Sequence, residues 1–182
     1  IGRMLFEGLD HIHRCKIVFL DFKLSNFCFD DFEVLRFVDF AHAVSVHDSK
    51  PSLENVNGAY LHPDIESRAA SPSVQSDVWS LTCSLLHLIL GDSFSKDAKK
   101  NIASLTKCLS ETPLNFFSHI LTSGLEEMPS VAEVLTHKFF NGTCLFSKQS
   151  AAEVSKTTKF KGRTLSVTPE GASGSLLKDS SL

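Results

Sequence analysis

The first residues of the chain carry a helical pattern of hydrophobic positions. Five apolar side chains fall at positions i, i+3, i+4, i+8 and i+11, one face of an α-helix: Ile1, Met4, Leu5, Leu9 and Ile12. We expect this helix to end near Arg14 and to lead into a short apolar strand that ends at Phe19. Residues 27–29 and 34–38 predict two more short strands, joined by a turn at Asp30 and Asp31.

A second pattern covers nearly the whole circumference of a helix rather than one face. It begins at Ser76, which we expect to be the N-cap, and stops at Gly91. Its apolar members are Trp79, Leu81, Cys83, Leu85, Leu86, Leu88, Ile89 and Leu90. A helix that is apolar all round is buried on nearly all sides.

Three shorter helices are predicted beyond it, near residues 102–109, 114–121 and 131–137. The last is opened by a capping box between Ser130 and Glu133. Residues 1–141 therefore predict one folded domain. Residues 142–182 are rich in Ser, Thr and Lys without periodicity, and are predicted to be a disordered tail.

Composition changes this picture only by excluding classes of function. The chain has 182 residues, 42% of them hydrophobic, and a net charge of −3, which gives no broad surface for nucleic acid or anionic membrane. The longest apolar run, near residues 85–90, is too short to span a bilayer. The five cysteines form no C-x-x-C pair, which argues against a zinc site or a disulfide framework. With no secretory signal, we expect a cytoplasmic, intracellular protein, and the first residue, Ile1, suggests a fragment.

Candidate chemistry gathers where the first strand breaks into a loop. Residues two apart in an extended loop face the same way, so Asp21 and Lys23 can address one reacting group. Asn26 and Asp39 supply neutral and anionic oxygens, a ligand set suited to a hard cation such as magnesium. The alternative is a solvated strand-to-loop turn that carries unrelated polar residues.

Two motifs of the protein kinases are similar to parts of this chain. The catalytic loop H-R-D-x-K-x-x-N resembles Phe19-Leu20-Asp21-Phe22-Lys23-Leu24-Ser25-Asn26, and the metal-binding D-F-G resembles Asp39-Phe40-Ala41. The resemblance extends to about residue 141. It implies an α+β, mainly α-helical fold, the large C-terminal lobe of a protein kinase domain. The smaller N-terminal lobe, with its glycine-rich loop and strand lysine, is absent from this chain.

The resemblance also implies a catalytic pair and a cofactor site. Asp21 would orient a substrate hydroxyl, and Lys23 would neutralise the transferring phosphate. Asn26 and Asp39 would hold magnesium, and together with Cys28 in the floor of the adenine pocket they would bind ATP. ATP and Mg²⁺ are expected by resemblance only, and we do not expect them to bind tightly to these residues alone.

An anchor and partners are implied in the same way. Asp77 would hold the backbone of the catalytic loop, unless it only favours a helix N-terminus through its charge. The expected partners are the missing N-terminal lobe and a protein that is either a substrate or a scaffolded partner. No nucleic acid and no membrane are expected.

Several positions depart from the family pattern. Phe19 and Leu20 stand where the family has His and Arg. Phe19 is expected to pack against Phe40, whereas Leu20 has no donor with which to hold a phosphorylated segment. Ala41 replaces a glycine, and an alanine forced into a left-handed conformation would stiffen this hinge.

A further departure concerns an ion pair. Asp64 shortens the family's glutamate and Met128 replaces its arginine partner, so we expect Asp64 to be exposed or paired elsewhere. Two hypotheses follow for the parent protein. The first is a pseudokinase, a kinase-shaped binding or scaffolding module with little or no activity. The alternative is an active ATP-dependent Ser/Thr protein kinase, a class that Lys23 favours.

Overall fold

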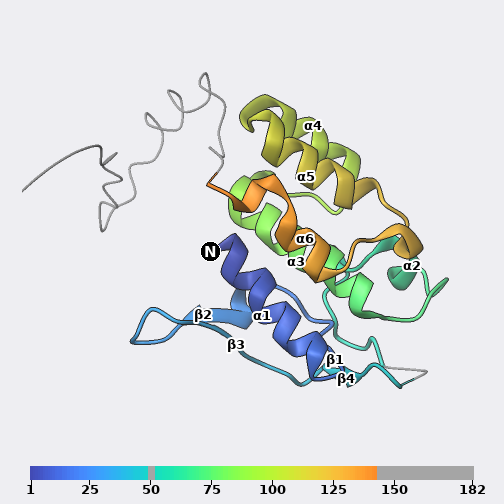
Figure 1. Ribbon diagram of the computed structural model, residues 1–182. Coiled ribbons are helices and arrows are strands. Elements are labelled where there is room, and N and C mark those ends of the chain that lie inside the picture. Colours follow the sequence, from blue (N-terminus) through green and yellow to red (C-terminus); the bar gives the residue numbers. More distant parts are fainter. Residues whose placement is uncertain (49–51, 143–182) are drawn as a thin grey trace, which may run out of the picture.

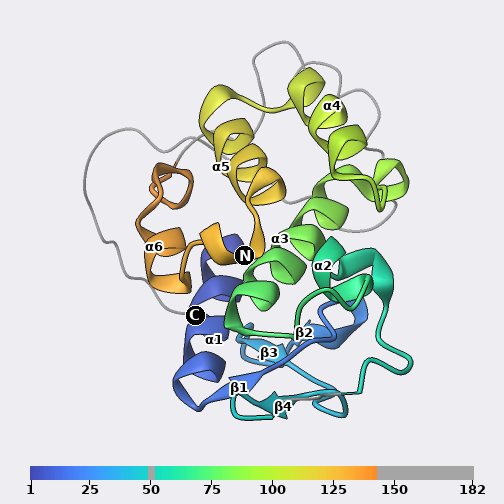
Figure 2. The same cartoon turned by 90° about the vertical axis from the view of Figure 1, so that its right-hand side faces the viewer.

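Helix α3 (Val74–Leu90) crosses the middle of the molecule (Figure 1). The computed structural model describes residues 1–48 and 52–142. Its other helices and strands are α1 (Gly2–Arg14), β1 (Ile17–Val18), β2 (Phe27–Phe29), β3 (Leu35–Phe37), β4 (Val44–Ser45), α2 (Pro63–Glu66), α4 (Ala98–Cys108), α5 (Glu111–Thr122) and α6 (Val131–Thr136). α1 and the strands lie on one side of α3, and α4 and α5 lie on the other (Figure 1, Figure 2). The described chain is mainly α-helical with short antiparallel strands, as predicted.

Helix α3 is buried along most of its length, as its apolar pattern predicted. Every residue from Ser76 to Leu86 is buried, and α1, α4 and α5 all contact the helix. The hydroxyls of Ser80, Thr82 and Ser84 each donate to the carbonyl four residues earlier. These internal bonds let small polar side chains lie in the core.

The start of α3 differs from the prediction. Ser73, not Ser76, is the N-cap. The two serines form a reciprocal box, in which Ser76 N donates to Ser73 Oγ at 3.3 Å and Ser73 N donates to Ser76 Oγ at 2.9 Å. Both are good caps by residue type, and the sequence does not show which one has extended backbone. The predicted stop is confirmed, because Gly91 ends the helix with a φ of +52°.

The buried face of α1 includes Phe6, which the helical pattern missed. The buried residues of this helix are Leu5, Phe6, Leu9 and Ile12. Ile1 is 60% and Met4 is 38% exposed, so the predicted face was wrong at its first turn. Phe6 packs edge-on against the rings of Phe116 in α5 and Phe140. The α5 contact therefore turns the buried face toward Phe6.

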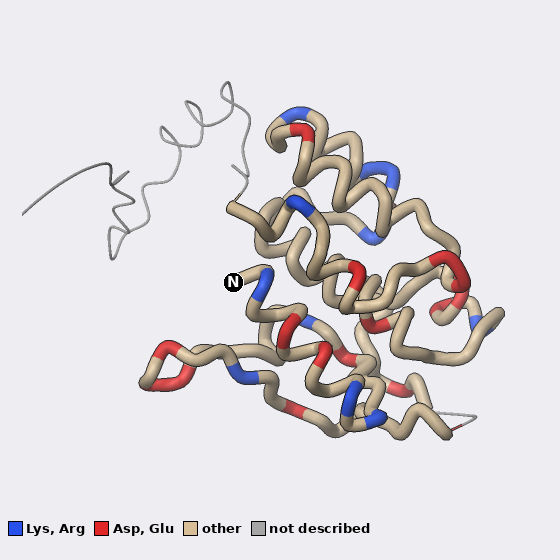
Figure 3. Tube along the Cα trace, viewed as in Figure 1, with Lys and Arg blue, Asp and Glu red and all other residues tan. Residues whose placement is uncertain are grey.

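Two separate antiparallel pairs make up the strands of the described residues. β2 pairs with β3 in the register Phe27–Phe37 and Phe29–Leu35, so the predicted hairpin is confirmed with a shorter second strand. Acidic residues gather at the end of this hairpin (Figure 3). β1 pairs with β4, which was not predicted because a two-residue strand shows no alternation.

The three shorter helices beyond α3 are confirmed as α4, α5 and α6. α4 and α5 begin earlier than predicted, at Ala98 and Glu111. The capping box that opens α6 is present, with Ser130 N donating to Glu133 Oε2 at 2.8 Å. Within the described residues, no helix combines the length and hydropathy that a membrane span requires. The tail predicted from residue 142 lies, apart from Gly142 itself, outside the described residues.

Gly8 is a point of close approach between α1 and the hairpin. A Cβ on this residue would lie 2.5 Å from the ring of Phe37, which three other phenylalanine rings hold in place. Overpacking in Gly8→Ala costs about 1–3 kcal/mol, and alanine gains roughly 1 kcal/mol over glycine within a helix. We therefore predict that the variant loses up to about 2 kcal/mol in the free energy of unfolding.

Urea denaturation of the chain measures this effect, with Gly2→Ala as the matched control. A Cβ on Gly2 would meet only ordinary contacts, the nearest at 3.5 Å, so this variant should lose no stability. If Gly8→Ala were as stable as Gly2→Ala, the ring of Phe37 would have to be free to move, contrary to the packing described.

Candidate active site

The loop between β1 and β2 begins with a strained turn at Leu20. The φ of Leu20 is +69°, in the left-handed region that a leucine rarely adopts. Across it, Asp21 N donates to Phe19 O at 2.9 Å. A hydrogen bond between residues two apart makes this a γ-turn. Such strain costs about 1–3 kcal/mol and persists only where surrounding contacts hold it.

Asp77, in the first turn of α3, supplies those contacts. Its Oδ2 accepts a hydrogen bond from Phe19 N at 2.7 Å, and its Oδ1 accepts one from Leu20 N at 3.0 Å. Nε2 of His13 lies 3.0 Å from the same Oδ2. Burial raises the pKa of the fully buried Asp77 carboxyl, while the hydrogen bonds from His13 and from the two backbone N–H groups act to lower it.

Asp21, Lys23 and Asn26 lie in direct contact. Lys23 Nζ donates to Asp21 Oδ2 at 2.6 Å. Asn26 Nδ2 donates to the same oxygen at 3.0 Å and to the Asp21 carbonyl at 2.9 Å. Asp21 is 1% exposed and Asn26 3%, whereas the Lys23 side chain is 29% exposed. The acid and the ammonium therefore face each other.

One oxygen of the Asp21 carboxylate has no hydrogen-bond partner among the described residues. Asp21 Oδ1 is buried and accepts no hydrogen bond from the described residues. A buried acceptor without a partner costs about 1–3 kcal/mol, and such groups are rare in native proteins. This oxygen is therefore left with the capacity to accept a hydrogen bond.

The backbone pairing of the hairpin brings Asp39 close to Asn26. Val38 N donates to Asn26 O at 2.9 Å, which extends the β2–β3 ladder by one step, and Asp39 follows directly. Asp39 is exposed, and its Oδ1 accepts a long hydrogen bond from Ala41 N at 3.4 Å. Its carboxylate and the Asn26 amide oxygen are the donor types that magnesium takes. In residues 1–48 and 52–142, no three His, Cys, Asp or Glu side chains group to hold a metal ion.

The segment that follows Asp39 corrects one prediction and confirms another. The strain predicted for Ala41 is absent, because the left-handed residue here is Asp39, with a φ of +63°. The predicted contact between Phe19 and Phe40 is present, with ring centroids 4.9 Å apart and planes at 86°. Phe19 also contacts Phe22 at 4.7 Å. Aromatic packing thus joins the γ-turn to the segment that carries Asp39.

Cys28 lies on the outer face of the hairpin. Phe27 and Phe37 pack against the core, so the alternating residues Cys28 and Arg36, which pair across the strands, point outward. Cys28 is exposed, and Val38, next to Asn26 on the ladder, is 38% exposed. The outer face of the hairpin is therefore accessible beside Asn26 and Asp39.

The expectation that Asp64 is exposed or paired elsewhere is confirmed. Its side chain is 50% exposed, and its Oδ2 lies 3.6 Å from His62 Nδ1. Met128 is buried and belongs to the core. Met128 therefore packs in the core at the position where the family pattern has the arginine of an ion pair.

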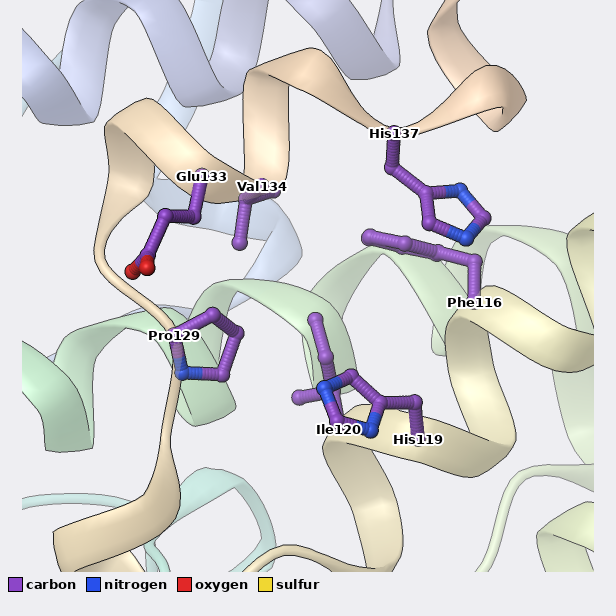
Figure 4. A pocket seen from close by; sticks show the side chains of 7 residues that line it. All are labelled: Phe116, His119, Ile120, Pro129, Glu133, Val134 and His137. Atoms are coloured by element: carbon purple, nitrogen blue, oxygen red, sulfur yellow. The ribbon is translucent and has the colours of Figure 1, made fainter.

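A pocket of about 240 Å³ lies between α5 and α6, away from this loop (Figure 4). It is lined by Phe116, His119, Ile120, Pro129, Glu133, Val134 and His137. Burial lowers the pKa of His137, and the positive charges of His119 and Lys138 lower it further. His137 Nδ1 accepts from Phe139 N at 3.1 Å and so caps the short 3₁₀ turn that follows. None of the candidate catalytic residues lines this pocket.

Comparison with known proteins matches the chain to one family. A family model described as a protein kinase domain matches residues 1–140. Rhodopsin kinase GRK7 of Sus scrofa is 32% identical over 97 residues, covering 53% of this chain and 18% of that protein. Serine/threonine-protein kinase PLK2 of Mus musculus is 25% identical over 151 residues, covering 76% and 22%. The probable serine/threonine-protein kinase CCRP1 of Zea mays is 26% identical over 148 residues, covering 74% and 24%. The chain thus spans less than a quarter of the length of these relatives.

Replacing the carboxylate of Asp77 tests whether it holds the γ-turn. In Asp77→Asn an NH₂ group replaces one acceptor oxygen, so the N–H of either Phe19 or Leu20 faces a donor. We predict a loss of about 3 kcal/mol in the free energy of unfolding, measured by urea denaturation of the chain. Asp92→Asn is the matched control, because Asp92 is exposed and its replacement should change stability by less than about 0.5 kcal/mol. Equal midpoints for the two variants would contradict the role of Asp77.

Proposed function

The chain belongs to the protein kinase family, and we propose that its parent protein carries a Ser/Thr-type kinase domain with little or no phosphotransferase activity. Such a pseudokinase acts as a binding or scaffolding module for another protein. The observation that carries this proposal is the enclosure of Asp21. Its side chain is 1% exposed, and its Oδ2 is already paired with Lys23 at 2.6 Å.

Phosphoryl transfer relies on positioning and electrostatics more than on covalent chemistry by the protein. A substrate hydroxyl has to come within about 2.6–3.2 Å of the group that takes its proton. Asp21 has only Oδ1 free for this purpose, and that oxygen is buried. Lys23 uses one of its three ammonium N–H donors on Asp21, so a phosphate has to share this ammonium with the buried carboxylate. We infer that this sharing weakens the contact of Lys23 with a phosphate.

Three substitutions support the same proposal. Leu20 is buried and has no donor for a phosphorylated segment. Phe19 packs against other rings, where the family has a hydrogen-bonding histidine. Met128 lies in the core, so Asp64 lacks the arginine partner of the family pattern. Each substitution places an apolar side chain where the family pattern has a polar one.

The alternative is an active ATP-dependent Ser/Thr protein kinase, and one observation favours it. Asn26 uses its amide nitrogen to bind Asp21. Among the residues that the structure describes, its amide oxygen accepts only a long bond from Ser25 at 3.3 Å. That oxygen and the carboxylate of Asp39 would hold magnesium, which neutralises phosphate charge when it is bound with ATP. Asp77 would keep its place as the anchor of the loop under either alternative.

We also propose a cytoplasmic location, with a protein substrate or a scaffolded protein as the partner. Cys15, Cys28 and Cys83 form no disulfide within the described residues. Burial raises the pKa of Cys83 to about 12. Cysteines without disulfides are typical of a reducing compartment.

Thermal denaturation of the full-length parent protein in ATP and Mg²⁺ tests the proposal. A site with a Kd of about 10 μM would add about 2.7 kcal/mol of stability at 1 mM ATP. We predict less than about 0.4 kcal/mol, which corresponds to a Kd above about 1 mM. A transfer assay with a generic protein substrate should show no incorporation of phosphate.

Asp39→Asn and Asp92→Asn form a matched pair for this test. Under the pseudokinase proposal, neither change alters the melting curve in ATP and Mg²⁺. In an active kinase, Asp39→Asn removes both nucleotide stabilisation and turnover, whereas Asp92→Asn leaves them in place. Metal-dependent turnover that Asp39→Asn abolishes would refute the proposal and establish the alternative.

The 182-residue chain, assayed by itself, is predicted neither to transfer phosphate nor to bind ATP tightly. Its described residues supply one wall for a nucleotide, formed by the outer face of the hairpin with Asn26 and Asp39. Closure and positioning contribute about 7–11 kcal/mol to such reactions, and one wall does not provide them. Isothermal titration with ATP and Mg²⁺, together with a transfer assay, measures both properties. Turnover by this chain that disappears in Asp39→Ala would show that one wall is enough for phosphate transfer, and the prediction would be wrong.

A further inference from the structure

The tip of the β2–β3 hairpin holds an aromatic ring out into solvent. Phe32 is 85% exposed, the highest value among the exposed large hydrophobic side chains described. Asp30 fixes the tip, because its Oδ1 accepts from Phe32 N at 3.0 Å and from Val34 N at 2.9 Å. Its Oδ2 pairs with Arg36 at 2.8 Å. The bonds from Val34 and Arg36 hold the pKa of Asp30 below its usual value. The backbone that carries the ring is therefore preorganised for contact with a partner.

Two carboxylates flank this ring. Asp31 and Glu33 are exposed, and neither forms an ion pair with another described residue. Figure 3 shows the acidic residues at the tip, which projects away from the helices in Figure 1. Phe29, 50% exposed, adds apolar surface beside them. The tip fits a basic partner that brings an apolar side chain of its own.

The chain itself contains a segment with this chemistry. Residues 156–163 read Lys-Thr-Thr-Lys-Phe-Lys-Gly-Arg, with four cations around Phe160 and no acid. The two parts of the chain also differ in net charge, with the acidic excess in the part that carries the hairpin. Residues 1–142 hold 12 Lys and Arg against 18 Asp and Glu, whereas residues 143–182 hold 6 against 3. The two parts therefore attract each other.

The intervening chain is long enough for the contact. The described residues end beside the first turn of α1, where Arg3 Nη2 donates to Phe140 O at 3.4 Å. From Gly2 to Gly8, where the hairpin packs, α1 rises about 9 Å. The hairpin from Phe37 to Phe32 adds about 17 Å. The residues from Gly142 to Lys156 extend to about 46 Å, well beyond the sum of these two distances.

We propose that residues 156–163 dock on the hairpin tip of the same molecule, with Phe160 against Phe32 and the cations beside Asp31 and Glu33. The contact is independent of whether the parent protein transfers phosphate. It is electrostatic at its rim, so it weakens with salt. It also covers the apolar surface that the hairpin otherwise exposes.

Limited trypsin digestion of the 182-residue chain tests this proposal, because trypsin cleaves after Lys and Arg. At low salt we expect cleavage after Lys159 and Lys161 to be about tenfold slower than after Lys148 and Lys178, which lie outside the segment. In 0.5 M salt the difference should fall below about twofold. A synthetic peptide of residues 145–182 should show no such difference, which separates docking from the local preference of the protease.

Variants of the hairpin identify the surface. Asp31→Asn combined with Glu33→Gln, and Phe32→Ser alone, should each remove the slower cleavage. Glu126→Gln combined with Glu127→Gln changes another exposed acidic pair and should leave it intact. Docking within one molecule does not depend on concentration, so the difference should survive tenfold dilution. Loss on dilution would assign the occupant to a second copy and overturn the proposal, as would equal cleavage at all four sites or slow cleavage in the hairpin variants.

Discussion

Two backbone N–H groups, those of Phe19 and Leu20, point into the single buried carboxylate of Asp77. A hydrogen bond to a charged group contributes about 1.5–3 kcal/mol, so the pair offsets the roughly 1–3 kcal/mol that a left-handed Leu20 costs. His13 adds a third partner from α1. Because α3 is buried on nearly all sides, this carboxylate ties the loop to the core. This anchor thereby fixes the part of the loop that carries Asp21, Lys23 and Asn26.

Packing between aromatic rings holds the loop where the polar residues of the family motif are missing. Phe19 meets Phe22, Phe37 and Phe40 within 6 Å, and Phe37 in turn lies against Gly8 of α1. These contacts are strong but carry no charge, so a phosphate group does not change them. The loop is therefore held by burial rather than by a contact that modification can make or break. This stabilises one arrangement of the site and removes a means of switching it.

The sequence predicted those features that depend on side-chain type along a single element. Examples are the burial of α3, the stop at Gly91 and the capping box at Ser130. It failed where the outcome depends on contacts between distant segments. Phe6 is buried because α5 supplies Phe116, and His13 lies near Asp77 because two helices cross. No local pattern in the sequence predicts either contact. The strain was misplaced for a related reason: a glycine in the family motif marks a flexible position, and here Asp39 takes the left-handed backbone instead.

The candidate site shows the same limit most clearly. Spacing in the sequence places Asp21 and Lys23 on one side of the loop, but it does not tell whether they face a substrate or each other. A buried carboxylate needs a partner, and a lysine two residues away on the same side is the nearest one available. The pair at 2.6 Å thus serves the stability of the loop. A phosphate would share the Lys23 ammonium with this pair, and a substrate hydroxyl would have only the buried Oδ1 of Asp21 to bind. The presence of these residues thus has a structural reason besides catalysis, and it is the enclosure of Asp21, not the residue types, that favours a pseudokinase.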